Sequence, residues 1–343
     1  MKVRQEKTER TIYFEICRII AVFCIMFLHT GGRGVDAWIY TESTWVYMTS
    51  LAGSVISNMG VPLFWMISGA LLLPKEESWE KVYRKRIPRI AGALIIFSVL
   101  RYIYICIVGD PSGYKGGFFR RFYTQNIFTP YWFLYEYLGI LFVLPFLRKM
   151  VQNLTEQEER LLFVLLLGWN ILNDVSNMYL GIGFVLNLHF YSSLSYFILG
   201  YLMENCRMLR RSERRGVRLG IGCTALTAVV LNSYVCSQYE PKVLESLTML
   251  LTISVYYLIR YMGEKRIWNN TVLRSFILWC GSNVFGIYLI EDYLRNAIAF
   301  IWEWSAPYIS QVPACFPWLL SVFLLGNVLV SGIRKLPILR RVV

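Results

Sequence analysis

The sequence predicts an all-α fold: a polytopic bundle of about ten transmembrane helices in one domain spanning residues 1–343, with both termini in the cytoplasm. Three observations lead to this prediction. Hydrophobic residues make up 56% of the chain and charged residues only 17%, whereas soluble domains carry about 25% charge. Apolar runs long enough to cross a bilayer recur along the whole length. The segments between these runs are alternately rich and poor in basic residues, as the positive-inside rule requires.

The expected spans follow one another from the N-terminus with short polar connections. The first run is long and lacks a small-residue cleavage site, so we expect a retained helix and not a signal peptide. The second span, which contains Asn58 and then Gly60–Gly69 with Pro62, is expected to be an interrupted helix. The longest outer connection, about residues 110–130, is too short for an appended soluble domain. The spans cover residues 11–30, 50–73, 88–109, 131–147, 160–177, 184–203, 216–236, 243–262, 275–302 and 314–333.

The net charge of +13 indicates membrane topology and attraction to anionic lipid, and not nucleic-acid binding. With the N-terminus inside, most of the 35 Lys and Arg residues fall in the two terminal segments and the cytoplasmic loops. The remainder are Arg33, Lys115, Arg120, Arg121 and Lys242 in outer loops, and Arg18, Arg101 and Arg295 within spans. We therefore expect the lipid bilayer, and no nucleic acid, as a partner.

Arg18 lies inside the first span, where a charge costs several kcal/mol unless it lines a cavity or finds a partner. His29 follows eleven positions later, which is three helical turns plus about 20°. The two side chains therefore share one face, about 16 Å apart along the axis. Glu15 joins this face one turn earlier. Because histidine is the commonest general base near neutral pH, Arg18 and His29 are candidate functional residues.

Other polar groups gather in the half of the expected bundle near the outer face. Glu136 lies within about two turns of that face. In the ninth span, Glu291 and Arg295 are four residues apart, so the simplest interpretation is an ion pair between them. The second histidine, His189, has no such partner in sequence and is interpreted as an interfacial residue. The same ninth span also carries Tyr288 and Asp292.

A basic stretch leads into the third expected span through Arg86-Ile87-Pro88-Arg89. Proline fits the first turn of a helix, so we expect a helix to begin here with Arg86 and Arg89 on one side. Two arginines at a helix N-terminus suit a phosphate group. The alternative, an orientation signal for membrane insertion, is equally open.

The sequence predicts no metal site. Its eight cysteines form no CxxC pair, which is the spacing that many metal and redox sites use. Two histidines, one of them on the same face as an arginine, do not make a ligand set.

Six motifs occur in order along nearly the whole chain. The first combines an acidic residue, an arginine and, after ten further residues, a histidine: Glu15, Arg18 and His29. The others are Val61–Ala70, Arg86–Ile90, Trp132–Glu136 ahead of Pro145, Tyr196–Tyr201 and Ser282–Glu291. Together they resemble the membrane acyltransferase 3 family, which O-acylates surface polysaccharides and related acceptors. Many members end the last motif with histidine, where this chain has Glu291.

The resemblance implies an acyl-CoA-dependent O-acyltransferase in a bacterial-type cytoplasmic membrane. It would move an acyl group, with acetyl as the first candidate, from cytoplasmic acyl-CoA to a hydroxyl of a cell-surface glycan or glycan precursor. The residues implied are Arg86, Arg89 and Ser68 for the donor, Arg18 and His29 for catalysis, and Glu15, Glu136, Tyr288 and Glu291 for orientation or the acceptor. His29 would act as general base or briefly carry the acyl group. Either role needs a neutral imidazole, so activity should fall at acidic pH.

Two other classes of function stay open. A transporter of a small polar solute also has polar residues and broken helices within the membrane, although the chain shows no internal repeat and its cytoplasmic basic pair suits a phosphorylated donor. A non-catalytic scaffold in polysaccharide assembly is favoured by Glu291 and opposed by the intact Arg18–His29 pair. Acyl transfer by the purified protein, set against solute uptake without acyl-CoA, separates these classes.

Overall fold

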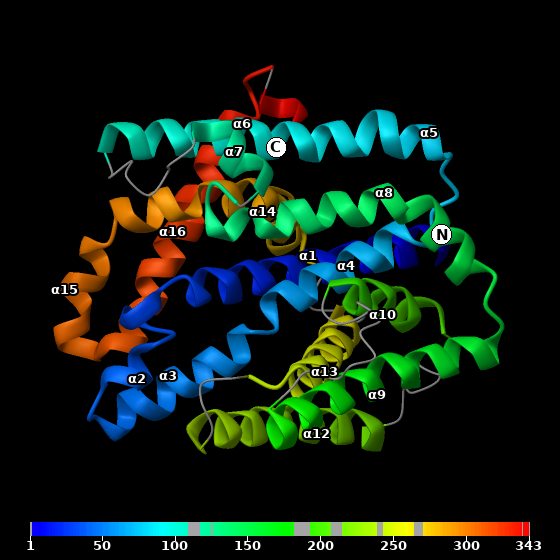
Figure 1. Cartoon of the computed structure of the whole chain (residues 1–343), viewed down its shortest axis with the longest axis horizontal. Helices are drawn as coiled ribbons and strands as arrows, with labels where there is room; N and C mark the ends of the chain where they lie inside the picture. The colour runs from blue at the N-terminus through cyan, green and yellow to red at the C-terminus, as the bar shows by residue number, and fades with distance from the viewer. Residues whose placement is uncertain are drawn as a thin grey trace. The chain divides into compact units, whose positions relative to one another are not determined.

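The computed structural model describes residues 2–108, 117–124, 126–181, 193–206, 215–238, 243–263, 270–337 and 339–342. Every regular element in these ranges is a helix (Figure 1), which confirms the all-α class. The chain divides into two compact units. The first comprises Met1–Leu72 and Leu154–Ser331, and the second comprises Leu73–Asn153 and Gly332–Val343.

The first unit contains the candidate catalytic helices. Its helices are α1 (Lys2–Leu28), η1 (Gly31–Arg33), α2 (Ala37–Tyr40), α3 (Thr44–Ser57), α4 (Gly60–Leu72), α9 (Glu156–Leu180), α10 (Ser193–Asn205), α12 (Arg215–Gln238), α13 (Glu245–Gly263), α14 (Thr271–Ala297), α15 (Phe300–Ile309) and α16 (Gln311–Ile333). The second unit contains α5 (Trp79–Lys81), the π-helical turn η2 (Val82–Arg86), α6 (Ile87–Val108), α7 (Gly117–Thr124), η4 (Thr129–Tyr131), α8 (Trp132–Gln152) and η6 (Leu339–Arg341).

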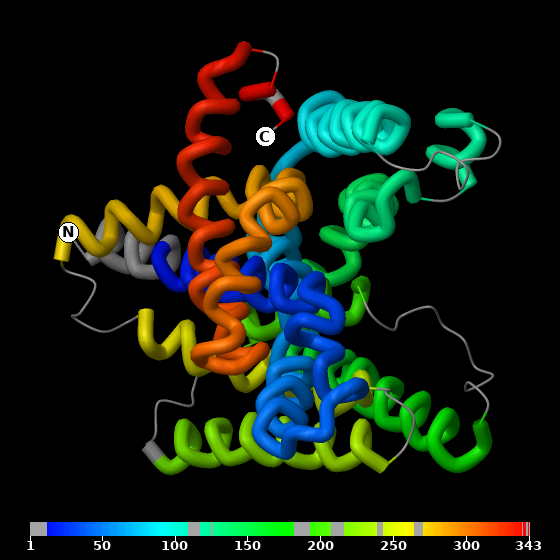
Figure 2. The backbone as a smooth tube through the Cα atoms, turned by 90° about the vertical axis from the view of Figure 1, so that its left-hand side faces the viewer, coloured from blue at the N-terminus to red at the C-terminus, as the bar shows by residue number. Residues whose placement is uncertain are grey.

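Helix α1 runs through the interior of the first unit, beside α4 in both views (Figures 1 and 2). It packs against α4, α13, α14 and α3. Its side chains Cys17, Ala21, Val22 and Met26 are fully buried. A helix that is apolar on nearly all sides is expected at such a position, and polar side chains on it therefore point at neighbouring helices.

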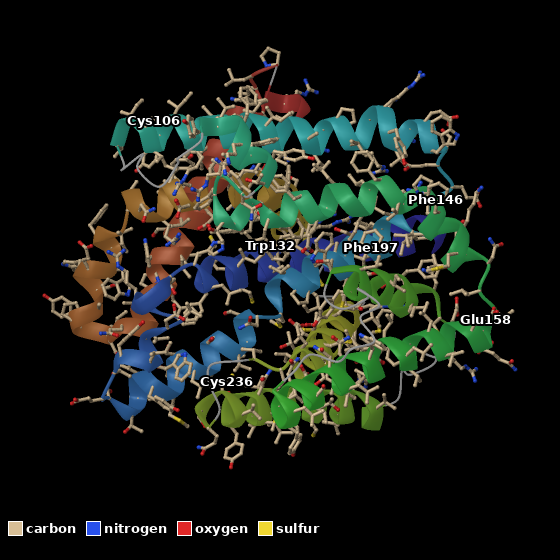
Figure 3. All side chains as sticks on the ribbon, in the orientation of Figure 1. Cys106, Trp132, Phe146, Glu158, Phe197 and Cys236 are labelled. Atoms are coloured by element: carbon tan, nitrogen blue, oxygen red, sulfur yellow. The ribbon has the colours of Figure 1, made fainter. Side chains whose placement is uncertain are left out.

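Helices α4 and α10 cross in close contact. A side chain at Gly69 would overlap the carbonyl oxygen of Phe197, and one at Gly200 would overlap the carbonyl oxygen of Met66. Figure 3 labels Phe197 on α10, close to α4. Glycine permits this approach because it has no Cβ, as at many helix crossings in membranes. The crossing fixes α4 against a helix that follows it more than one hundred residues later in the chain.

Seven of the expected spans coincide with helices that are long and apolar enough to cross a membrane. The other three expected spans, 11–30, 184–203 and 243–262, overlap α1, α10 and α13. The chain is thus a multi-pass helical membrane protein, while the count of ten and the sides of the termini stay predictions. The expected break in the second span is confirmed, because α3 ends at Ser57 and α4 begins at Gly60.

Two expected helix boundaries are wrong. The span 275–302 does not continue to its predicted end, because α14 stops at Ala297 and α15 begins at Phe300. Nor does a helix begin at Pro88: the helical run starts at Trp79, after the extended residue Ser78, and passes through η2 into α6. The π-helical turn ends at Arg86, two residues before Pro88, which lacks the backbone N–H of a regular helix.

Candidate functional site

The structure brings His29 and Glu291 together from opposite ends of the first unit's sequence. His29 follows the last residue of α1, and its backbone N–H still donates to the carbonyl of Ile25 at 3.2 Å. Its Nδ1 lies 2.6 Å from Oε1 of Glu291, on α14. Glu291 is only 1% exposed, whereas the His29 side chain is 23% exposed. A buried carboxylate therefore holds an imidazole that is partly open to its surroundings.

Arg295 of α14 binds the Glu291 carboxylate, and Arg295 is in turn contacted by Asp292 of α14 and Trp318 of α16. Arg295 donates from Nε to Oε2 of Glu291 at 3.2 Å and from a terminal nitrogen to Asp292 at 2.7 Å, which confirms the ion pair predicted from the four-residue spacing. The indole N–H of Trp318, on α16, donates to the carbonyl of Arg295 at 3.1 Å. Both oxygens of Glu291 are thus engaged, one by the imidazole and one by the guanidinium.

This geometry assigns the two ring nitrogens of His29 different roles. An ionised carboxylate only accepts hydrogen bonds, so Nδ1 carries the proton in the neutral imidazole and donates it to Glu291. The lone pair then lies on Nε2, which has no partner among the side chains that the structure describes. A histidine held by a buried carboxylate in this way can take a proton on its second nitrogen, because the carboxylate orients the ring and stabilises the imidazolium.

Arg18 and Glu15 form an ion pair three residues apart on α1, at the other end of the stripe that leads to His29. Gly281 of α14 lies directly against Glu15, and a side chain there would overlap the Glu15 carboxylate. One oxygen of Glu15 meets Arg18, and the second is buried without a hydrogen-bond partner among the described residues. The charge of Arg18 is therefore matched within its own helix, as a membrane arginine requires.

Two further predicted site residues belong to the same unit. Tyr288 is buried on α14, one turn before Glu291, so it lies on the side of the helix that carries the acidic pair. Ser68 lies half-buried on α4 next to Gly69, the residue of the α4–α10 crossing. His189 lies outside the described residues.

The basic residues predicted to bind the donor lie in the second unit. Arg86 ends η2, and its guanidinium donates twice to Glu77, from Nε at 3.0 Å and from a terminal nitrogen at 2.7 Å. Arg148, which is buried on α8, donates to the same carboxylate at 3.1 Å. Arg86 thus has an internal carboxylate partner and does not stand at a helix N-terminus. Arg89 is exposed on α6.

Glu77 binds the basic side chains of Arg86, Arg148 and Lys81. It was not predicted from the sequence as a functional residue. The hydrogen bonds from Arg86, aided by those from Arg148 and Lys81, lower the pKa of the Glu77 carboxyl to about 2. The signal that could have revealed it is an acidic pair, Glu76 and Glu77, within an otherwise basic segment. Glu136, the remaining predicted residue of this unit, is exposed on α8.

No group of three or more His, Cys, Asp or Glu side chains that could hold a metal ion occurs within the described ranges. The contacts around His29 suit proton transfer at its imidazole, with charge stabilisation by the Glu291–Arg295 pair. A proton acceptor of this kind suits reactions in which a hydroxyl becomes a nucleophile.

Comparison with known proteins identifies the family. The model of the acyltransferase 3 family, described as an acyltransferase domain, matches residues 11–333. No curated protein and no solved structure matches the chain. The family match includes Arg18 on α1, His29 directly after α1, and Glu291 on α14. Since it extends over nearly the whole chain, this multi-pass membrane protein belongs to the acyltransferase 3 family.

Proposed function

We propose that the protein transfers an acyl group, in first place acetyl, from cytoplasmic acyl-CoA to a hydroxyl of a cell-surface glycan or glycan precursor, in the cytoplasmic membrane of a bacterial-type cell. The observation that carries the proposal is the 2.6 Å contact between Nδ1 of His29 and Glu291. It leaves Nε2 as a base for an acceptor hydroxyl. Family membership supports acyl transfer as the kind of reaction.

In the proposed reaction the acceptor oxygen attacks the thioester carbonyl carbon while Nε2 of His29 takes the hydroxyl proton. Glu291 stabilises the imidazolium that forms, and Arg295 keeps the carboxylate oriented. The carbon–sulfur bond then breaks, and the proton passes from Nε2 to the departing sulfur, which regenerates neutral histidine. A second route, in which Nε2 first accepts the acyl group itself, uses the same nitrogen. Tyr288, one turn from Glu291, is proposed to orient the acceptor.

For the donor, we propose that phosphate groups of CoA bind Arg89 and Arg86, and that Ser68 and Arg18 contact the remainder of the molecule. Arginine suits this role because its planar guanidinium binds phosphate with two hydrogen bonds. Glu77 already occupies the guanidinium of Arg86, so a phosphate must replace that carboxylate or bind alongside it. Glu15 and Glu136 are proposed as orienting or acceptor groups.

The proposal is tested with purified protein in nanodiscs, by following acetyl transfer from labelled acetyl-CoA to a glycan acceptor. His29→Ala should lose at least about 100-fold in rate, the usual contribution of a general base, with unchanged yield in the membrane. In the same assay, Arg86→Ala with Arg89→Ala should weaken acyl-CoA binding more than acceptor binding.

Normal turnover by the His29→Ala protein would contradict the proposed base. Solute uptake by wild-type protein without acyl-CoA, and no acyl transfer, would favour the transporter. Mass spectrometry of the surface glycan with and without the gene identifies the acyl group and the acceptor in the cell.

A further inference from the structure

Arg33 forms a second polar cluster close in sequence to His29. It is the last residue of η1 and follows His29 by four positions. Its guanidinium lies 5.2 Å from the ring centre of Trp302, on α15, and 5.4 Å from that of Trp318, on α16. A terminal nitrogen donates to Glu303 at 3.2 Å. Two tryptophan rings thus contact the guanidinium, and one of its terminal nitrogens binds a carboxylate.

The backbone that carries Arg33 is held in place by its neighbours. Cys315 donates from Sγ to the Arg33 carbonyl at 3.5 Å, and the Val35 N–H donates to the Thr30 hydroxyl at 2.9 Å. A Cβ at Gly34 would come within 2.5 Å of the Thr30 hydroxyl and 2.8 Å of Cys315 Sγ. The turn therefore presents the guanidinium from a fixed base, which lowers the entropy cost of binding a ligand.

A continuous series of contacts joins this cluster to the candidate base. Trp318, whose ring lies against Arg33, donates its indole N–H to the carbonyl of Arg295. Arg295 pairs with Glu291, and Glu291 binds His29. Three residues, Trp318, Arg295 and Glu291, thus connect Arg33 to His29 within one unit.

The guanidinium has more hydrogen-bond donors than its surroundings use. Arginine carries five N–H donors, yet Glu303 is the one hydrogen-bond acceptor that the described residues supply. The side chain of Arg33 is 36% exposed and that of Glu303 is 58% exposed. An exposed ion pair of this kind contributes little to stability, so Glu303 can yield its place to another oxyanion.

We propose that Arg33 binds an oxyanion, a carboxylate or phosphate, of an acidic acceptor, and that Glu303 competes with this group for the guanidinium. The inference rests on the proposed function and narrows its acceptor to an acidic one. Arg33 is then a specificity-determining residue: it binds the acceptor away from the reacting atoms and directs a hydroxyl toward His29.

Lipid is the competing source of such an oxyanion. Helix α15 carries exposed aromatic side chains at Phe300, Trp304 and Tyr308, a composition that is typical of the membrane–water interface. A phospholipid headgroup in that layer also offers a phosphate. The hydrogen-bonded turn and its link to His29 favour the acceptor as the source of the oxyanion.

The test compares methyl β-D-glucuronide with its neutral uronamide, in nanodiscs of phosphatidylcholine and in nanodiscs that contain phosphatidylglycerol. Binding is measured on His29→Ala protein, so that it does not depend on turnover, and kcat/KM is measured on protein with an intact His29. Arg33→Gln should weaken glucuronide binding and lower kcat/KM for the glucuronide about tenfold or more, as expected for a lost charged hydrogen bond. It should leave the binding and kcat/KM of the uronamide unchanged. Glu303→Gln should strengthen glucuronide binding.

Arg160→Gln and Glu156→Gln are matched controls, because they alter an exposed Arg–Glu ion pair of the same unit that lies on α9. Neither control variant should change the binding or the kcat/KM of the glucuronide or the uronamide. Equal binding of the two sugars by wild-type protein, equal loss of both in Arg33→Gln, or an effect confined to phosphatidylglycerol nanodiscs would overturn the inference. Absence of acyl transfer with Arg33-dependent glucuronide binding would instead overturn the proposed function alone.

Discussion

At the scale of single residues, Glu291 determines what His29 can do. In the family motif that this segment resembles, many members have histidine at this position. A carboxylate changes the chemistry, because it accepts a hydrogen bond from Nδ1 of His29 and adds a negative charge. Its two oxygens are divided between His29 and Arg295. The charge that stabilises an imidazolium is thereby buried beside it, where solvent screens it little.

Glu291→Gln tests this role. The amide keeps the shape but loses the charge, and its NH2 group can face Nδ1 and impose the wrong tautomer. We expect kcat to fall about 10²- to 10⁴-fold, the range of general-base contributions, with little change in acceptor KM. Nitrogen NMR of His29 should show the proton moving from Nδ1. Glu156→Gln, on the exposed start of α9, is the control, and a kcat within about threefold of wild type in Glu291→Gln would contradict the assignment.

Glu77 gives a pH dependence whose sign follows from its lowered pKa. The carboxyl titrates near 4.5 when unperturbed and near 2 in the folded protein. The stabilisation is therefore fully present above pH 4.5 and is lost as the pH falls toward 2. Glu77→Gln should lower the thermal unfolding midpoint at pH 7, and its difference from wild type should shrink between pH 4.5 and 2.

The exposed neighbour Glu76 provides the control for that experiment. Glu76→Gln should leave both the midpoint and its pH dependence near wild type, because its side chain is exposed and no described basic side chain forms an ion pair with it. Circular dichroism at a series of pH values measures both variants. If the difference in midpoint between Glu77→Gln and wild type stays constant with pH, the ionised Glu77 carboxylate is not the source of this stability.

Spacing within one helix could be predicted from the sequence, and contacts between distant helices could not. The Glu291–Arg295 pair follows from a four-residue interval, and Glu15 and Arg18 likewise share one turn. The contact between His29 and Glu291 joins residues 262 positions apart, and the family resemblance indicated only that both belong to the site. The ion pair of Arg86 with Glu77 was missed because the two residues are nine positions apart, outside the three- or four-residue spacing of helical pairs. Nothing in local spacing brings Arg148 of α8 to the same carboxylate.

At the scale of helices, the predictions hold where the chain carries a stop signal. The break before α4 coincides with Gly60 and Pro62, which weaken a helix locally. The end of α14 has no such signal, because the residues around Ala297 remain apolar and helix-compatible. At the start of α5, the extended residue Ser78 is a signal for the beginning of a helix. Pro88 was a more conspicuous start signal, and it led to the wrong boundary.

The α4–α10 crossing makes a prediction at this scale. Gly69→Ala and Gly200→Ala each place a Cβ on a backbone carbonyl of the facing helix, which no side-chain rotation can relieve. We expect each to cost at least the roughly 1–3 kcal/mol of ordinary overpacking and to lower the thermal midpoint in detergent. Gly168→Ala, on α9, where a Cβ meets open space, should be tolerated. Midpoints for Gly69→Ala and Gly168→Ala that agree would contradict the close crossing.

At the scale of the whole molecule, composition and charge alternation predict the class of protein. Each apolar run that lies in lipid must satisfy its backbone hydrogen bonds internally and therefore forms a helix. The runs thus predict where the helices lie along the sequence. They do not reveal which helices pack together, since lipid-facing and helix-facing sides are both apolar in a membrane. The packing of α1 in the interior of the first unit and the division into two units are therefore findings of the structure alone.

The glycine contact between α4 and α10 also bears on how the chain is assembled during synthesis. About 120 residues separate the end of α4 from the start of α10, so at about 5–20 residues per second α4 waits roughly 6–25 s for its partner. Throughout that interval its glycine face is exposed to lipid or to the insertion machinery. A substitution at Gly69 thus acts on a nascent intermediate, and cellular quality control should remove the variant before it accumulates as an inactive protein.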